Sequence, residues 1–369
     1  MDASNGPERQ PEPEEGPDIE GAIDALLAEG GIDSHRSLIR RLVRASIGMG
    51  QDGVGRLNLK ISATALEEMR DAFRIFTPFV GTPKVTIFGS ARIQAHDPLW
   101  EEAEAVSRCL AEQGWMVVTG AGPGIMEAAA TGAGPEQSLG VSIRLPFEQV
   151  PAHLHSGVDR LVAMKYFFTR KLMLVKESRG FVCLPGGFGT LDETFELLTL
   201  QQTGKMVPVP IVLLDRPGGE FWRGFERFVS EQLEGSGMIT AGDLDRLLIT
   251  DSVDAAVEEV TGFWRNYDSL RWVDHQLVMR VRSAPTDEEL DELNDRFADM
   301  IHEGRILRTD PLQVERNDSD DRHTLDLPRI VFTPVQKKVG ELHRLIRALN
   351  TLESAPEKSD HPPLPTAEA

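Results

Sequence analysis

The sequence predicts an α/β protein built on a doubly wound parallel sheet, with N-terminal helices and a small C-terminal α+β appendage. Short β-branched apolar segments alternate with helical segments between residues 82 and 265. These segments are apolar along their whole length, which is typical of parallel strands covered by helices on both faces. Glycine-rich turns follow three of the strands, at the edge of the sheet where such folds bind ligands.

The elements of this domain follow in order from their patterns. Strands are predicted at 84–90, 115–120, 138–146, 180–185, 207–215 and 247–250, where apolar and β-branched residues run together. Helices are predicted where apolar residues recur at three- and four-residue steps or follow a glycine turn: 98–114, the segment after 124, 159–178, 191–204, 221–233 and 252–264. Gly114 ends the first of these helices.

The flanking segments differ in composition. Residues 1–18 and 351–369 are acidic or proline-rich tails with few large apolar side chains, which predicts disorder. Residues 19–81 have helical apolar spacing, and 82–265 make up the predicted doubly wound α/β domain. The appendage, 270–350, is predicted to hold strands at 277–282 and 327–334, and helices after the TDEE capping box at 286–289 and at 339–350.

Charge and composition narrow the classes of function. The 369 residues carry a formal net charge of −20, which disfavours nucleic-acid and anionic-membrane partners but not a small phosphorylated ligand. Two cysteines, Cys109 and Cys183, cannot form a disulfide framework and are expected in the core. The N-terminal residues lack the pattern of a signal peptide, and no apolar stretch approaches the roughly 18 residues of a membrane span. A cytoplasmic location is therefore expected.

Three strand ends carry small residues: FGSAR (88–92), TGAGPGIME (119–127) and LPGGFGTLDE (184–193). Exposed backbone N–H groups in such turns, with the positive end of the following helix, form anion sites. No G-x-x-x-x-G-K-[ST] motif is present, and Ile125 stands where a dinucleotide motif needs its third glycine. The turns therefore favour a mononucleotide ligand, with Gly89, Ser90 and Glu127 among its candidate contacts.

Plainer interpretations of the same residues stay open at this point. Thr190 and Glu193 have the spacing of a helix capping box, although the preceding glycines exceed what a cap requires. Arg170 and Lys171 could form a solvated helix face, and Glu127 could complement its helix dipole. His153 and His155 lack neighbouring ligands at metal-binding spacing, so no metal ion is expected. No lysine stands in a pyridoxal-phosphate context, and no cofactor is expected.

The segment PGGFGTLDE (185–193) resembles the PGGxGTxxE motif of the Lonely Guy (LOG) family of nucleoside 5′-monophosphate phosphoribohydrolases, long mislabelled as lysine decarboxylases. The similarity covers about residues 82–235 and extends through FGSAR (88–92), GAGPGIMEAA (120–129), LPFEQ (145–149) and YFFTRK (166–171). It implies a Rossmann-like fold and a homodimer or a higher assembly of dimers. The implied reaction splits an AMP-like or cytokinin riboside 5′-monophosphate into free base and ribose 5-phosphate.

The resemblance also assigns residues. It implies that Arg170 and Glu193 are catalytic. The residues implied to hold the phosphate are Gly187, Phe188, Gly189 and Thr190, and those at other substrate-binding positions are Glu148, Lys171 and Thr199. An alternative function is a non-catalytic nucleotide sensor or carrier, in which the appendage would be the output module; the presence of both Arg170 and Glu193 argues against it.

Overall fold

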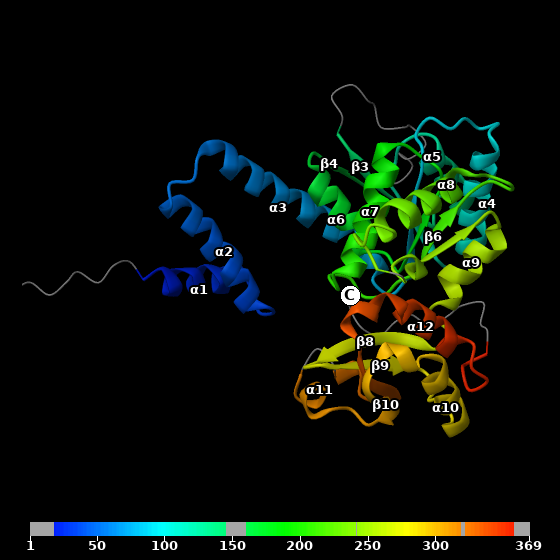
Figure 1. Ribbon diagram of the computed structural model, residues 1–369. Coiled ribbons are helices and arrows are strands. Elements are labelled where there is room, and N and C mark those ends of the chain that lie inside the picture. Colours follow the sequence, from blue (N-terminus) through cyan, green and yellow to red (C-terminus); the bar gives the residue numbers. More distant parts are fainter. Residues whose placement is uncertain (1–17, 145–159, 241, 319–321, 358–369) are drawn as a thin grey trace, which may run out of the picture. The chain divides into compact units, whose positions relative to one another are not determined.

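The structure is a computed structural model that describes residues 18–144, 160–240, 242–318 and 322–357 (Figure 1). Most of both predicted tails, and Glu148, lie outside the described residues. The chain divides into two compact units, Met1–Glu67 and Glu68–Ala369. No helix in the described part of the chain is long and apolar enough to cross a membrane.

The first unit is helical, as predicted. It contains α1 (Ile19–Glu29), α2 (Arg36–Gln51) and the greater part of α3 (Arg56–Phe76). Asp18 caps α1 by accepting a hydrogen bond from the backbone N–H of Gly21 at 2.9 Å. Ion pairs join α1 to α2, among them Arg44 with Glu20 at 2.9 Å.

The second unit contains the predicted parallel sheet, which confirms the doubly wound α/β fold. Its seven strands lie in the order β4-β3-β2-β1-β5-β6-β7. All neighbouring strands in it are parallel. The strands are β1 (Lys84–Phe88), β2 (Met116–Thr119), β3 (Ser138–Ile143), β4 (Leu161–Met164), β5 (Gly180–Cys183), β6 (Ile211–Leu214) and β7 (Leu247–Thr250).

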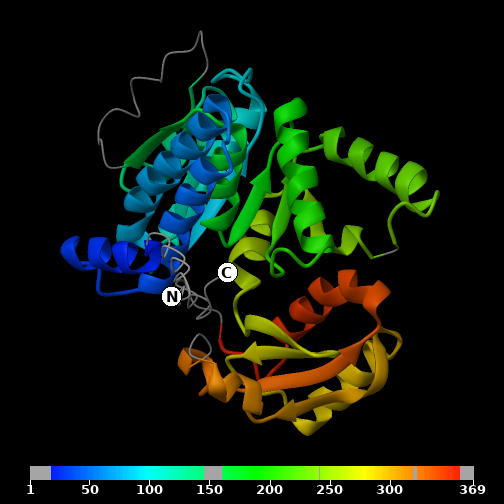
Figure 2. The same cartoon turned by 90° about the vertical axis from the view of Figure 1, so that its left-hand side faces the viewer.

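Helices cover both faces of this sheet (Figures 1 and 2). The chain moves outward from β1 to β4 and then returns to continue from β5 to β7 on the other side. Because crossovers between parallel strands are right-handed, the outgoing and returning helices cover opposite faces. The outgoing helices are α4 (Pro98–Glu112) and α5 (Ile125–Ala133), with α9 (Val253–Gly262) packed against α4. The returning helices are α6 (Phe167–Lys176), α7 (Phe188–Gln202) and α8 (Phe221–Phe228).

The predicted helix at 159–178 is wrong in its first half. Leu161–Met164 form the edge strand β4, which pairs in parallel with β3 from Gly140 to Ile143, and α6 begins only at Phe167. Leu161, Val162 and Met164 share the apolar character of the helix that follows, and four residues are too few for periodicity to separate a strand from a helix. The pairing with β3, about twenty residues away, decides the conformation.

A second, antiparallel sheet forms the core of the C-terminal appendage, in the order β10-β11-β9-β8. Its strands are β8 (Tyr267–Val273), β9 (Gln276–Val281), β10 (Ile301–Thr309) and β11 (Arg329–Pro334), and its helices are α10 (Asp287–Arg296), α11 (Gln313–Asn317) and α12 (Leu342–Asn350). The sequence predicted β9, β11 and the Thr286 capping box, and missed β8 and β10. Asn350 on α12 connects the appendage to the end of α9. Its side chain accepts a hydrogen bond from the N–H of Tyr267 in β8 and donates one to Phe263 O, which follows α9.

Candidate functional site

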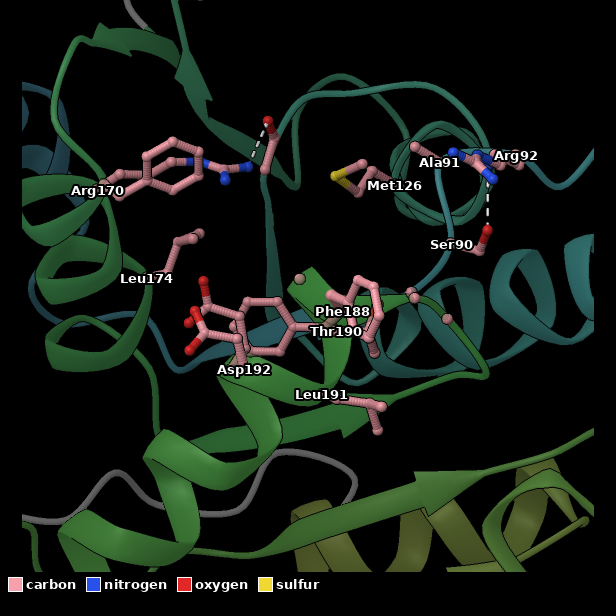
Figure 3. A pocket seen from close by; sticks show the side chains of 18 of the residues that line it. Ser90, Ala91, Arg92, Met126, Arg170, Leu174, Phe188, Thr190, Leu191 and Asp192 are labelled. Carbon is pink, nitrogen blue, oxygen red and sulfur yellow. Dashed lines mark hydrogen bonds between the residues drawn. The ribbon is translucent and has the colours of Figure 1, made fainter. Parts of the chain in front are cut away.

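A cavity of about 700 Å³ opens at the carboxyl edge of the parallel sheet (Figure 3). β1 and β5 are neighbours there, but the chain leaves β1 for α4 on one face and leaves β5 for α7 on the other. Divergence of two adjacent connections creates the crevice in which α/β proteins bind ligands. The two turns stay in contact at its floor, where Ser90 N–H donates to Pro185 O at 3.2 Å.

The third glycine turn lines this cavity and leads directly into α7. The helix begins at Phe188 with Gly187 as its N-cap, and no side chain caps it. The capping-box interpretation of Thr190 and Glu193 is therefore wrong, because Thr190 already lies in the first helical turn. The first N–H groups of α7 remain available to an anion, and the helix dipole favours negative charge at the same place.

The glycines of this turn have different surroundings. A Cβ on Gly186 would overlap the Thr190 hydroxyl, so packing alone requires a glycine there. A Cβ on Gly187 or Gly189 would meet no described atom within 4 Å other than those of its chain neighbours and of its own helix backbone, and neither residue has a positive φ. The fold itself thus gives no reason for these two glycines, whereas a ligand lying against the backbone would give one.

Arg170 reaches the cavity from α6 and is anchored to the ends of two strands. Its Nε donates to Val141 O in β3 at 2.9 Å, and its Nη2 donates to Gly120 O after β2 at 3.2 Å. A side chain on Gly120 would overlap the Arg170 guanidinium, so this glycine makes room for the arginine. Burial lowers the pKa of Arg170, the Glu193 charge opposes that shift, and a guanidinium stays protonated in either case.

Glu193 lines the same cavity from the second turn of α7 and is only 8% exposed. Burial raises the pKa of its carboxyl group to about 7, against the attraction of Lys171 and Arg170. Its Oε2 has no hydrogen-bond partner among the described residues, and Lys171 Nζ lies 3.9 Å away. The site therefore holds a carboxyl group that changes charge near neutral pH and has one buried oxygen without a hydrogen-bond partner among the described residues.

Lys171 lies beside the cavity and is held by carboxylates on α7. Its Nζ lies 2.8 Å from Asp192 and 3.6 Å from Glu196. Although burial opposes the change, the hydrogen bond to Asp192 and the charge of Glu193 raise the pKa of Lys171. A positive charge is thus fixed beside Glu193, where it moderates the cost of ionising that buried group.

The structure brings most of the predicted site residues together, and some lie elsewhere. The predicted residues that line the cavity are Gly89, Ser90, Arg170, Gly187, Phe188, Gly189, Thr190 and Glu193. Thr199 instead lines a separate cavity of about 90 Å³, two turns further along α7. Glu127 lies in the first turn of α5 and is not part of the cavity wall. Glu148 is outside the described residues.

Several lining residues were not predicted. They include Arg92, Met126, Phe167, Asp192 and Phe221. Arg92 and Asp192 belong to the FGSAR and PGGFGTLDE segments, so their positions within those motifs could have identified them. Phe221 lies seven residues after the end of β6, and no motif in the sequence identifies it as a residue of the cavity wall. The described residues contain no group of three or more His, Cys, Asp or Glu side chains arranged to hold a metal ion.

Comparison with known proteins finds a matching family and similar proteins for the part of the chain that contains the cavity. Residues 124–260 match the family described as "Possible lysine decarboxylase". The cytokinin riboside 5′-monophosphate phosphoribohydrolase of Mycobacterium marinum is 31% identical over 172 residues, which are 46% of this chain and 88% of the relative. The protein of the same name from Mycobacterium tuberculosis is 30% identical, over 44% of this chain and 85% of the relative. Among solved structures, the molybdenum cofactor binding protein of Rippkaea orientalis is 23% identical, with a TM-score of 0.34 over 48% of this chain and 94% of that protein.

The buried Glu193 predicts a pH-dependent gain in stability on its replacement by glutamine. Its pKa is about 7 in the folded protein and near 4.5 when unfolded, so the folded state binds the proton more tightly. The contribution of Glu193 to the free energy of unfolding is therefore fully present below pH 4.5 and is lost as the pH rises through 7. The free energy of unfolding of Glu193→Gln, relative to wild type, should increase by about 2 to 3 kcal/mol between pH 5 and pH 8. Urea denaturation at several pH values measures it.

The matched control is Glu196→Gln. Glu196 is also on α7 and also lies near Lys171, but its side chain is 41% exposed. This control should show a much weaker trend with pH. A difference between Glu193→Gln and wild type that stays constant from pH 5 to pH 8 would show that Glu193 does not titrate near neutrality.

Proposed function

The chain belongs to the LOG family of phosphoribohydrolases, and from this premise we propose that it hydrolyses the N-glycosidic bond of a nucleoside 5′-monophosphate, releasing the free base and ribose 5-phosphate. The observation that carries the proposal is the convergence of Arg170, Glu193 and the uncapped N-terminus of α7 on one cavity. A phosphate, a reacting sugar carbon and a departing base need three different partners. This cavity offers one of each kind.

The phosphate is assigned to the first turn of α7. Backbone N–H groups of Phe188, Gly189 and Thr190 lie at the positive end of a 15-residue helix, and no side chain competes for them. Gly187 and Gly189 leave open space where side chains would otherwise stand. Binding energy gained at the phosphate then positions the sugar for reaction, although the phosphate does not itself react.

Glu193 is assigned to the sugar. Departure of the base leaves positive charge on the ribose, and a carboxylate beside C1′ stabilises that charge and accepts a proton from the attacking water. A pKa of about 7 makes the carboxylate a stronger base than an ordinary glutamate while leaving much of it ionised near neutral pH. The overall reaction consumes one water, whose hydroxyl goes to C1′ and whose proton balances the released base.

Arg170 is assigned to the departing base. Its bonds to Val141 O and Gly120 O fix the guanidinium, and Nη1 makes no hydrogen bond to any described residue. A fixed cation beside the leaving group stabilises the negative charge that develops on the base as the bond breaks. Because an arginine stays protonated, Arg170 acts as an electrostatic partner, and the proton comes from water or Glu193.

The substrate class proposed is an AMP-like or cytokinin riboside 5′-monophosphate. Cytokinin riboside 5′-monophosphate is the substrate named for the relatives from both mycobacteria. A panel of nucleoside monophosphates that includes isopentenyl-AMP identifies the preferred base. We also propose that the protein is cytoplasmic, as expected from the sequence.

A homodimer or an assembly of dimers is also proposed. Large apolar side chains are exposed on α6 and α7 beside the cavity: Phe167, Phe168 and Leu172 are 61%, 57% and 45% exposed, and Phe188 is 92% exposed. Exposed aromatic residues concentrated on adjoining helices are typical of protein interfaces. Sedimentation equilibrium measures the subunit number, and a monomer at micromolar concentration would contradict this part of the proposal.

The reaction predicts that the phosphate is required. Purified protein should release adenine from AMP with a kcat/KM about 100-fold or more above that for adenosine, because adenosine lacks the group that α7 binds. Glu193→Gln and Arg170→Ala should each lower kcat by about 100-fold or more. Chromatographic measurement of released base tests both expectations. Equal cleavage of adenosine would contradict the phosphate assignment, and tight AMP binding without cleavage by wild type would favour a sensor or carrier.

The glycine turn makes a second prediction. Gly187→Ala and Gly189→Ala should raise KM for AMP about tenfold or more, because each new methyl group enters the space assigned to the phosphate. Neither substitution should lower the free energy of unfolding, since each Cβ meets no described atom within 4 Å. Gly186→Ala is the comparison, and it should destabilise the protein through overlap with Thr190. An unchanged KM for AMP in both Gly187→Ala and Gly189→Ala would show that the phosphate does not bind against these two glycines.

A further inference from the structure

Glu68 on α3 contacts the connection between β4 and α6, the helix that carries Arg170, although it is about a hundred residues away in the sequence. It is 5% exposed and therefore buried. It also precedes the family match at 124–260 by more than fifty residues. Three donors converge on its carboxylate: Lys165 N–H, Tyr166 N–H at 3.4 Å and the Thr169 hydroxyl at 2.7 Å.

One of these donors, the Tyr166 N–H, is the group that the glutamate of a capping box binds at the start of a helix. Tyr166 is the N-cap of α6, and its own side chain makes no capping bond. In a capping box, the glutamate at the third helical position accepts from the N-cap N–H. α6 has Thr169 at that position, whose side chain is too short to reach back in this way. Glu68 supplies the missing carboxylate from another helix and also binds Thr169 itself.

The connection held by Glu68 controls where Arg170 lies. Only Lys165 and Tyr166 separate β4 from α6, and the N–H groups of both are bound to Glu68. Arg170 follows Thr169 directly and must reach Val141 O and Gly120 O at the same time. A shift of α6 along its axis would break this arrangement, because Val141 O lies within β3 and Gly120 O directly follows β2.

We infer that Glu68 is a positioning residue for the reaction: it fixes the first turn of α6 and thereby holds the Arg170 guanidinium in the cavity. This inference rests on the proposed function for its kinetic consequence, and the structural consequence can be measured separately. The segment of α3 from Glu68 onward thus helps to position a residue of the site. The buried Ala72 and Phe76 anchor this segment in the hydrophobic core.

The kinetic test compares Glu68→Gln with Glu67→Gln, an adjacent exposed glutamate on the same helix. Glutamine keeps the shape of Glu68 but loses its charge and replaces one acceptor oxygen with a donor, so it cannot bind all three donors. Misplacement of a reacting group by about 1 Å costs on the order of 100-fold in rate. Glu68→Gln should therefore lower kcat for AMP about 10- to 100-fold, with KM changed less than about threefold because the phosphate binds α7. Glu67→Gln should match wild type, and Glu68→Asp should restore part of the loss.

A double-mutant cycle separates positioning from general destabilisation. If Glu68 acts through Arg170, Glu68→Gln should lower the residual kcat of Arg170→Ala by no more than about twofold. Circular dichroism at the assay temperature measures the folded fraction of each variant. The inference is overturned if kcat of Glu68→Gln equals that of Glu67→Gln, if the two losses multiply, or if the folded fraction accounts for the loss.

Hydrogen exchange gives the readout that does not depend on activity. Peptides covering 165–176 should exchange faster in Glu68→Gln than in Glu67→Gln, because the start of α6 loses its cap. If wild type releases no base, the proposed function fails and exchange alone decides whether Glu68 holds α6. Unchanged exchange in these peptides would then overturn the inference.

Discussion

The site depends on the order of the parallel sheet. Because β1 lies at the centre and the chain extends from it to both edges, the turns after β1 and β5 separate toward opposite faces and leave a cavity between them. The same parallel arrangement brings the ends of β2 and β3 to this edge, where Gly120 O and Val141 O hold Arg170. Each functional group is therefore carried by an element whose position is fixed by strand pairing.

Charge at the site is arranged at a cost to stability. Glu193 is buried with one unpaired oxygen, and Arg170 is largely enclosed by protein, so neither group is placed where water would favour its charge. Lys171 reduces this cost without entering the cavity wall, since it is already bound to Asp192 and Glu196. In the proposed mechanism, a preorganised cation and a carboxylate that titrates near neutrality stabilise a transition state in which the sugar becomes positive and the base negative. In solution, water would have to reorganise to give the same stabilisation.

Local patterns in the sequence were enough to predict the fold class and much of the cavity. Continuous apolar strands identified the parallel sheet, and the motif around Gly187 and Glu193 identified one wall of the site. Features that depend on contacts distant in sequence could not be predicted in this way. The strand β4 is defined by its pairing with β3, the start of α7 excludes the capping box at Thr190, and the link between Glu68 and α6 spans about a hundred residues. A sequence pattern carries no record of such pairings.

If an ionised Glu193 drives bond cleavage, the rate must follow the titration of its carboxyl group, and the pH dependence of kcat/KM for AMP measures this. The rate should rise with pH and level off above an apparent pKa of about 7, the value for the free protein's Glu193. Ionisation of the substrate phosphate near pH 6 also affects the profile, so the residual activity of Glu193→Gln serves as the reference. The step near pH 7 should be present in wild type and absent from Glu193→Gln. A wild-type profile that is flat between pH 6.5 and 8, or the same step in both proteins, would contradict it.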